Sequence, residues 1–413
     1  MRTIGSPHQS TTNLGALLCL SLSMLLASLG TSITNIALPT LAQAFEAPFQ
    51  QVQWVVVSYL ATLTVFAVLA GRLGDIFGRQ RMLLLGLVLF SLASAFCALA
   101  FSLWSLISAR AVQGIGAAFL MTLTVALVRE TTKDDRVGRA MGTLATMSAF
   151  GTALGPSLGG LLVGSFGWRS VFWALIPIGL LGIGLALGAL PTRRGLAKSS
   201  PIRFSAVRDG SVLPSLVANL LVASVMMATL LVGPFYLGHA LGLRSSVVGL
   251  LMSLGPVISI CSGVPSGRLV DAWGAHFVLP IGLIMLIIGA FLLSVLPMFF
   301  GVFGYGAAIA ILTPGYQLFQ SANNTVVMAK VAEGQRGTVS GLLALSRNLG
   351  LLLGASVIGA VFAFGVGTAA IENAPPASIV HGMQLTFLVA SALMLAAFWI
   401  MRRGRPKNQP PPG

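Results

Sequence analysis

Apolar segments long enough to cross a lipid bilayer recur along the whole chain. A membrane-spanning helix needs about 20 predominantly apolar residues, and twelve such segments alternate with short polar connections. They cover approximately residues 14–38, 51–71, 82–102, 105–128, 139–164, 169–190, 211–236, 246–266, 277–297, 299–322, 337–364 and 382–401. Only 8% of the residues are charged, against roughly a quarter in soluble domains. The chain is therefore predicted to be an all-α membrane protein with twelve transmembrane helices.

The distribution of basic residues predicts how the chain is oriented in the membrane. Lysine and arginine number 24 against 9 acidic residues, which gives a formal net charge of +15. Twenty of the 24 lie in the termini and in alternate connections, all on one predicted side. Because basic residues gather on the cytoplasmic side, both termini are expected to be cytoplasmic, in a cell inner membrane. The charge is thus a topology signal, and no nucleic-acid partner is expected.

A long basic connection and an internal repeat divide the chain into halves. Residues 191–210 separate six predicted helices from six, and GRLGDIFG at 71–78 recurs as GRLVDAWG at 267–274. We predict an N-terminal six-helix bundle over 1–190, a cytoplasmic linker over 191–210, a C-terminal bundle over 211–401 and a cytoplasmic tail over 402–413. Two parallel repeats of six helices are the architecture expected of a secondary carrier.

Four motifs give the chain a family resemblance. They are TSITNIALP at 31–39, GRLGDIFGRQR at 71–81, ARAVQGIGAA at 109–118 and GTALGPSLGG at 151–160. Together they resemble the major facilitator superfamily and, within it, the drug:proton antiporters of the EmrB/QacA type. The resemblance implies the major facilitator fold and proton-coupled export of small amphipathic compounds by alternating access. A metabolite symporter, an uncoupled facilitator and a non-transporting membrane receptor remain alternatives.

The connection after the second predicted span has the residues of a conformational latch. Gly71 and Gly78 would permit close backbone approach and a tight turn. Asp75 is a carboxylate at the cytoplasmic boundary, where it is placed to bind the positive end of a helix dipole. The alternative is a solvated loop whose arginines serve only topology.

The resemblance implies further members of this latch. It implies that Asp75 joins the two halves in the outward-facing state, with Arg79 and Glu130 in the same charge relay. The second copy of the motif supplies Asp271 but has Ala275 where the first has Arg79. Asp271 is therefore expected to form the weaker latch.

The fifth predicted span has small residues at helical spacing. Its antiporter motif comprises Gly151, Gly155, Pro156, Gly159 and Gly160. Small residues four apart let helices pack closely in lipid, and Gly350 and Gly354 repeat this spacing in the eleventh span. Plain packing and a family-implied bending helix that seals against leak are equally favoured.

Polar residues inside the spans are candidates for a substrate cavity. An arginine at a membrane helix centre costs about 2.5–3.5 kcal/mol on insertion scales, so Arg110 marks either function or hydrogen bonding to backbone carbonyls as structural glue. The resemblance places helices 1, 4, 7 and 10 around a central cavity. The predicted cavity residues are Asn35, Arg110, Gln113, Asn219, Gln317 and Arg347, although each alone also fits interhelical glue, and Arg347 could reach the cytoplasmic surface.

The acidic residues bear on substrate charge and on proton coupling. All nine map to loops or span ends, so the cavity is predicted to be neutral to positive and its substrates neutral or weakly acidic. Drug antiporters of the resembling type commonly have an aspartate where this chain has Gly30. Glu130 is then the favoured proton carrier and His239 the alternative, with proton-independent transport left open.

Motifs of enzymes are absent from the sequence. It has no Walker loop, HExxH helix or GxSxG elbow, and its four histidines are scattered. We therefore expect no enzymatic activity, catalytic residue, metal or cofactor. The expected partners are a small-molecule substrate, protons and the lipid bilayer, and the protein is expected to be monomeric.

Overall fold

The computed structural model describes residues 8–131, 137–190, 212–329, 336–368, 371 and 374–403, and no strand occurs among them. The chain divides into two compact units. The first comprises Met1–Ser200 with Gly242–Pro256, and the second comprises Pro201–Leu241 with Val257–Gly413. Residues 242–256, which the sequence places in the second bundle, thus group with the first unit. The predicted linker over 191–210 lies outside the described residues, and the predicted domain boundaries stay a prediction.

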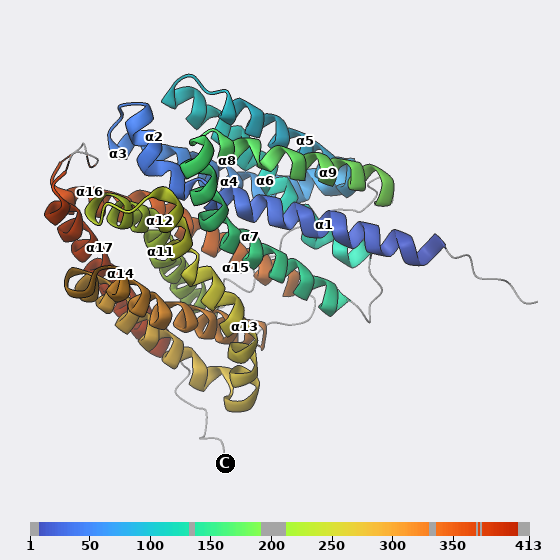
Figure 1. Cartoon of the computed structure of the whole chain (residues 1–413). Coiled ribbons are helices and arrows are strands. Elements are labelled where there is room, and N and C mark those ends of the chain that lie inside the picture. Colours follow the sequence, from blue (N-terminus) through green and yellow to red (C-terminus); the bar gives the residue numbers. More distant parts are fainter. Residues whose placement is uncertain are drawn as a thin grey trace, which may run out of the picture. The chain divides into compact units, whose positions relative to one another are not determined.

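Six long helices build the first unit and lie side by side in Figure 1, where blue to green marks their order in the chain. They are α1 (His8–Ser32), α4 (Trp54–Phe77), α5 (Arg79–Ala98), α6 (Leu103–Thr131), α7 (Val137–Phe166) and α9 (Leu175–Ala189). Shorter elements are η1 (Asn35–Ala37), α2 (Leu38–Ala44), α3 (Phe49–Val52), α8 (Ser170–Trp173) and α12 (Ser245–Met252). The first predicted span is therefore interrupted: α1 ends at Ser32, and the chain continues through η1 into α2.

The second unit contains the longest helix. Its elements are α11 (Leu213–Phe235), η3 (Tyr236–Ala240), most of α13 (Leu254–Trp273), α14 (Ala275–Ala329), α15 (Arg336–Leu353), η5 (Gly354–Ile358), α16 (Gly359–Val366) and α17 (Pro376–Arg403). Gly301 interrupts α14 with φ 51° and ψ −124°, a conformation that only glycine adopts readily. The elements η3 and η5 are π-helical turns that extend α11 and α15.

The described helices are long and apolar enough to embed the protein in a membrane. Ten qualify as spans, or eleven if the pair Phe49–Ala67 and Leu69–Phe77, bent by 48°, is one span. That number takes α14 as a single helix, although its 55 residues would extend about 80 Å across a hydrocarbon core about 30 Å thick. Counting its two arms separately would give twelve, so the predicted number stays a prediction.

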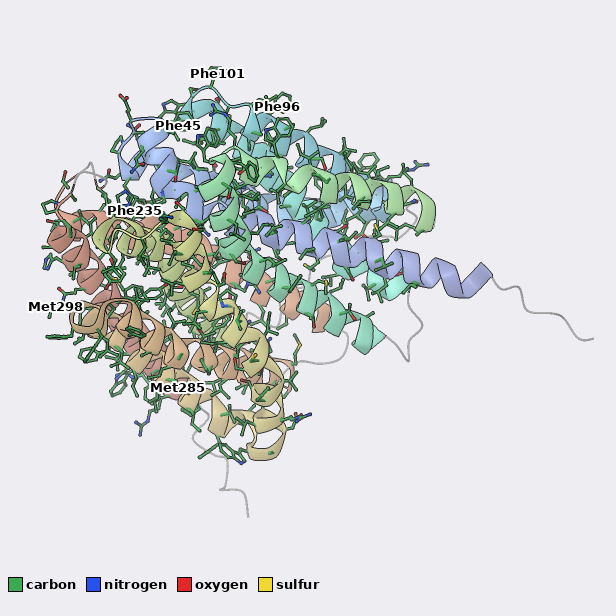
Figure 2. All side chains as sticks on the ribbon, in the orientation of Figure 1. Phe45, Phe96, Phe101, Phe235, Met285 and Met298 are labelled. Atoms are coloured by element: carbon green, nitrogen blue, oxygen red, sulfur yellow. The ribbon has the colours of Figure 1, made fainter. Side chains whose placement is uncertain are left out.

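Large apolar side chains cover the outside of both units. Figure 2 shows Phe96 and Phe101 at the surface of the first unit, where they are 66% and 88% exposed. In the second unit Met298 and Phe303 are 52% and 86% exposed. Soluble monomers rarely display apolar side chains on this scale, so the surface is one that lipid covers.

The glycines of the antiporter motif bring α7 into close contact with α1. A Cβ added to Gly151 would lie 2.7 Å from the carbonyl oxygen of Leu25, and one on Gly155 would lie 2.6 Å from the Cβ of Ser32. The Ser32 hydroxyl donates to the Gly151 carbonyl oxygen at 3.2 Å. The hydroxyls of Ser28 and Ser148 bond at 2.8 Å. These contacts show the close packing expected of the motif, whereas a sealing role stays a prediction.

The second unit contains a corresponding seam between α11 and α15. A Cβ on Gly350 would lie 2.7 Å from the Cβ of Ala223, and one at Gly354 would lie 2.7 Å from the Cβ of Met227. The Ser224 hydroxyl donates to the Gly350 carbonyl oxygen at 2.9 Å. Each unit therefore joins two helices through glycines and a serine-to-carbonyl hydrogen bond.

The α1–α7 seam gives a first prediction. Gly155→Val should lower the melting temperature of the purified protein in detergent by several degrees, because overpacking a close contact costs about 1–3 kcal/mol. Gly184→Val in α9 is the matched control, since nothing lies within 4 Å of a Cβ there. Tryptophan fluorescence during heating measures both, and equal melting temperatures for the two variants would contradict the seam.

Candidate functional site

A buried arginine is the centre of the polar network in the first unit. Arg110 on α6 is 0% exposed. Its Nε donates to the carbonyl oxygen of Val55 on α4 at 3.0 Å, and its Nη1 donates to that of Gly30 on α1 at 3.2 Å. Nη1 also donates to Oε1 of Gln113 at 2.5 Å. Arg110 thus links α6 to both α1 and α4.

Neighbouring side chains extend this network to a fourth helix. Nε2 of Gln113 donates to the hydroxyl of Ser94 on α5 at 2.7 Å. The guanidinium of Arg110 lies over the ring of Tyr59, with Cζ 4.1 Å from the ring centroid. The Tyr59 hydroxyl donates to the carbonyl oxygen of Ala27 at 2.9 Å. Four helices therefore meet at one hydrogen-bonded core.

Gly30 leaves no free space for an acidic side chain in this core. A Cβ at position 30 would lie 2.9 Å from Cζ of Phe90 and 3.1 Å from the Tyr59 hydroxyl. An aspartate there would have to displace the Phe90 ring. The glycine at this position is thus matched to the close packing of Phe90 and Tyr59 around it.

Among the described residues, Arg110 makes its hydrogen bonds and its ring contact with uncharged groups only. They are two backbone carbonyls, one amide and one aromatic ring. Nη2 has no hydrogen-bond partner among the described residues. Removing a charge from water is costly unless hydrogen bonds replace its hydration, and the carbonyls supply most of that replacement. This geometry favours the structural alternative for Arg110 and, in the part of the chain that the structure describes, leaves its positive charge without a carboxylate beside it.

The latch motif is a helix end and a turn rather than a loop. The helix α4 continues through Gly71 and Asp75 to Phe77, and Gly78 turns the chain into α5 with φ 98°. Arg79 donates to Oδ1 of Asp75 from Nε at 3.1 Å and from Nη2 at 2.8 Å. Asp75 and Arg79 are therefore directly paired, as i and i+4 neighbours with side chains 28% and 29% exposed.

The close approach expected at Gly71 occurs at Gly74 instead. A Cβ on Gly71 would make ordinary contact, 3.7 Å from the Thr122 side chain, whereas one on Gly74 would collide with Leu123. The expectation of close packing was wrong in its position: Gly71 and Gly74 both face α6, and Gly74 makes the closer contact, because sequence spacing does not fix which glycine lies nearest the neighbouring helix. The expected tight turn at Gly78 is confirmed.

Two other members of the predicted latch remain without a described contact. Glu130 belongs to α6, but its side chain lies outside the described residues. Asp271 is exposed near the end of α13. Binding of Asp75 or Asp271 to a helix terminus therefore stays a prediction.

Gln80 is a residue of this region that sequence reasoning missed. Its Nε2 donates to the carbonyl oxygens of Ala186 and Leu190 at 3.1 and 2.9 Å. The last carbonyls of a helix lack hydrogen-bond partners within that helix. Gln80 therefore pairs carbonyl oxygens at the end of α9 and fixes the turn after α4 against α9. A lone glutamine between two arginines gives no signal of this role in the sequence.

The three predicted cavity residues of the second unit differ in how they are bonded. Asn219 is 1% exposed and donates to the Leu343 carbonyl at 2.9 Å and to the Ser346 hydroxyl at 2.8 Å. Gln317 donates to the backbone carbonyl of Ser259 at 3.2 Å and also to its hydroxyl. Arg347 is partly exposed. Asn219 and Gln317 therefore join helices, whereas Arg347 does not.

Asn35 also makes a local bond. Its Nδ2 donates to the carbonyl oxygen of Thr31 at 3.2 Å, and its Oδ1 is buried with no hydrogen-bond partner among the described residues. Asn35 thus stabilises the interruption after α1. Of the six predicted cavity residues, the structure brings Arg110 and Gln113 into direct contact.

Comparison with known proteins identifies relatives across the chain. The family profile described as Major Facilitator Superfamily matches residues 20–355. The riboflavin transporter RibZ of Clostridioides difficile is 27% identical over 399 residues, covering 84% of this chain and 88% of the relative. The multidrug resistance protein Stp of Mycobacterium tuberculosis is 29% identical over 419 residues, covering 85% of this chain and 76% of the relative.

Solved structures share the fold. A bacterial homologue of the human lysosomal transporter Spinster, in an inward-facing and occupied conformation, superposes with a TM-score of 0.76 at 18% identity and covers 98% of this chain and 100% of the homologue. A variant of the nucleoside transporter NupG has a TM-score of 0.74 at 14% identity, covering 95% and 100%. At these identities the likeness establishes the major facilitator fold and says nothing of substrate.

The hydrogen bonds of Arg110 give a second prediction. Arg110→Lys should lower the melting temperature strongly, because an ammonium group cannot reach the Val55 and Gly30 carbonyls together and each lost charge-assisted bond costs about 1.5–3 kcal/mol. Arg244→Lys, at an exposed position, is the control and should melt like the wild type. If the two variants unfold at the same temperature, Arg110 does not hold the bundle together.

Proposed function

We propose that this chain, which belongs to the Major Facilitator Superfamily, exports small amphipathic compounds by alternating access. Transport across a membrane is the activity of the family, and relatives of this chain include the multidrug resistance protein Stp. The single observation that carries export is the complete GTALGPSLGG motif, typical by resemblance of antiporters, whose Gly151 and Gly155 pack on α1.

The buried charge supports neutral or acidic substrates over lipophilic cations. Arg110 is surrounded by uncharged groups, and position 30 is a glycine. A cation entering a site of low dielectric constant without a carboxylate would lose its hydration and gain no counter-charge. Neutral molecules avoid that cost, and anions are attracted.

Transport of a metabolite is the second candidate. The riboflavin transporter RibZ is about as similar to this chain as Stp is, so sequence similarity alone does not decide between drug and metabolite. The direction of transport distinguishes metabolite uptake from export. Proteoliposomes with inserted protein of known orientation would show net movement toward the outward side for an exporter and toward the cytoplasmic side for an importer.

The proposal includes an arrangement in the membrane. We propose two six-helix bundles joined by the basic connection over 191–210, twelve helices in all, both termini cytoplasmic in the inner membrane of a bacterium, and a monomer. The basic residues near the cytoplasmic ends, among them Arg402 and Arg403 in the last turn of α17, support this orientation.

The pair formed by Asp75 and Arg79 gives the third prediction. Asp75→Asn should nearly abolish transport while leaving the amount and melting temperature of the protein unchanged. A partly exposed ion pair such as this one contributes only about 1 kcal/mol or less to stability, whereas a latch needs its charge in one state of the cycle. Initial rates of substrate uptake into proteoliposomes at matched protein levels measure the effect.

The matched control for this latch is Asp271→Asn, in the second copy of the motif. Because Ala275 replaces the arginine there, its transport rate should fall less than that of Asp75→Asn. Equal rates for wild type and Asp75→Asn would contradict the latch.

Proton coupling gives the fourth prediction. Glu130 is proposed to take and release the proton, since carboxylates change their proton affinity with burial and arginines remain charged. An imposed pH gradient, with the membrane potential clamped, should accelerate transport by the wild type, and Glu130→Gln should remove that acceleration. A wild-type transport rate that does not change with the pH gradient would instead indicate a proton-independent carrier. Acceleration that persists in Glu130→Gln would exclude Glu130 as the proton carrier.

A further inference from the structure

Arg347 is an arginine inside a membrane span, and it has no bonded partner among the described residues. It lies six residues after Gly341, where the span Gly341–Val366 begins, or about 9 Å along the helix. Its side chain is partly exposed, and no hydrogen bond or ion pair joins it to another residue in the part of the chain that the structure describes. Charged residues at such depth usually face the protein interior or a water-filled cavity.

The helix phase shows which side of α15 carries Arg347. Successive residues are about 100° apart around a helix. Arg347 therefore lies about 40° from Leu343, which is 7% exposed, and about 60° from Gly350, which packs on α11. Leu349 and Leu353 are large and exposed, at 36% and 39%. They lie about 160° and 120° from Arg347, on the far side of the buried positions Leu343 and Gly350. Arg347 thus flanks the α11–α15 seam, away from the face that suits lipid.

The surface beside Arg347 is mixed, because Leu351, one turn later and about 40° away around the helix, is also partly exposed. Ala344 and Asn348 flank it and are exposed and partly exposed, respectively. Gly341 lies six residues earlier, about 120° around the helix from Arg347, and a Cβ added there would have nothing within 4 Å. A guanidinium without a partner among the described residues, beside small exposed side chains, is a candidate to bind an anion.

The two arginines within the spans therefore differ in what they are free to bind. Arg110 is sealed by Val55, Gly30, Gln113 and Tyr59. Arg347 has the donors of its planar group available, and that group matches a carboxylate with two parallel hydrogen bonds.

We propose that Arg347 binds the carboxylate of acidic amphipathic substrates and so selects anions among the compounds that the protein transports. This rests on the proposed function, because it names a substrate class for that transporter. Arg110 is a positioning residue in this account: it holds α1, α4 and α6 together and does not touch the substrate.

Binding to matched acid and amide probes tests this assignment. The probes are benzoate, 2-naphthoate and 1-pyrenebutyrate, each paired with its primary amide, added to the full chain in phosphatidylcholine nanodiscs. The wild type should bind at least one acid about tenfold more tightly than its amide, as expected for one charge-assisted contact. Arg347→Gln should remove that preference while leaving amide binding unchanged. Arg347→Lys should retain part of it, and Arg402→Gln, which removes an exposed cation of the same unit, should retain all of it.

The other outcomes overturn either this assignment or the proposed transport function. Absence of acid preference in the wild type, or its persistence in Arg347→Gln, shows that Arg347 does not bind a carboxylate. Equal weakening of acid and amide with a lower melting temperature shows a structural role. If Arg347→Gln alters only the melting temperature, and only in nanodiscs containing phosphatidylglycerol, the arginine binds lipid phosphate. Acid-selective binding without solute movement in proteoliposomes would instead contradict the proposed transport function and leave the carboxylate site standing.

Discussion

A permanent positive charge held away from water is the constraint on which the first unit depends. Arg110 cannot discard its proton to lower the cost of burial, so the surrounding helices must supply acceptors. They do so with backbone carbonyls: Val55 on α4 and Gly30 on α1 each accept from the guanidinium. A backbone carbonyl is available only if the helix that carries it lies at the right distance and rotation. The need to pair the hydrogen-bond donors of Arg110 therefore fixes the mutual placement of α1, α4 and α6. Gln113 extends the arrangement to α5 through its hydrogen bond to Ser94.

Lipid makes close helix packing depend on shape and hydrogen bonds, since there is little hydrophobic gain in moving a leucine from lipid to protein. Both units show this solution. In the first, α7 approaches α1 at Gly151 and Gly155. In the second, α15 and the following turn η5 approach α11 at Gly350 and Gly354, and in each seam a serine donates to a glycine carbonyl. The seams make each pair of helices a rigid element. Change of shape during transport is then expected at the interruptions, such as the break after Ser32 and the π-helical turn Tyr236–Ala240.

The sequence predicts features that follow from local spacing. It does not predict contacts that depend on how one helix is rotated against another. Membrane spans, the Gly78 turn and the glycine seam follow from hydropathy, the need for positive φ and four-residue spacing. The proximity of Arg110 and Gln113 follows from i, i+3 geometry. Gly74, Gln80 and the backbone partners of Arg110 were not predictable, because their partners lie on other helices at positions that no local pattern encodes. The same reason explains why Arg110 and Arg347, grouped together by residue type, separate into a sealed and an unpaired arginine once their surroundings are known.

A membrane interior that holds the buried Arg110 with no described carboxylate partner should discriminate among solutes by charge. The most direct measurement is the accumulation of a panel of neutral, acidic and lipophilic cationic compounds in a host that lacks its own efflux pumps, with and without this protein. The account predicts lower accumulation of neutral or acidic amphipathic members and little change for ethidium-like cations. Strong export of the cations, with no change for neutral and acidic compounds, would contradict it.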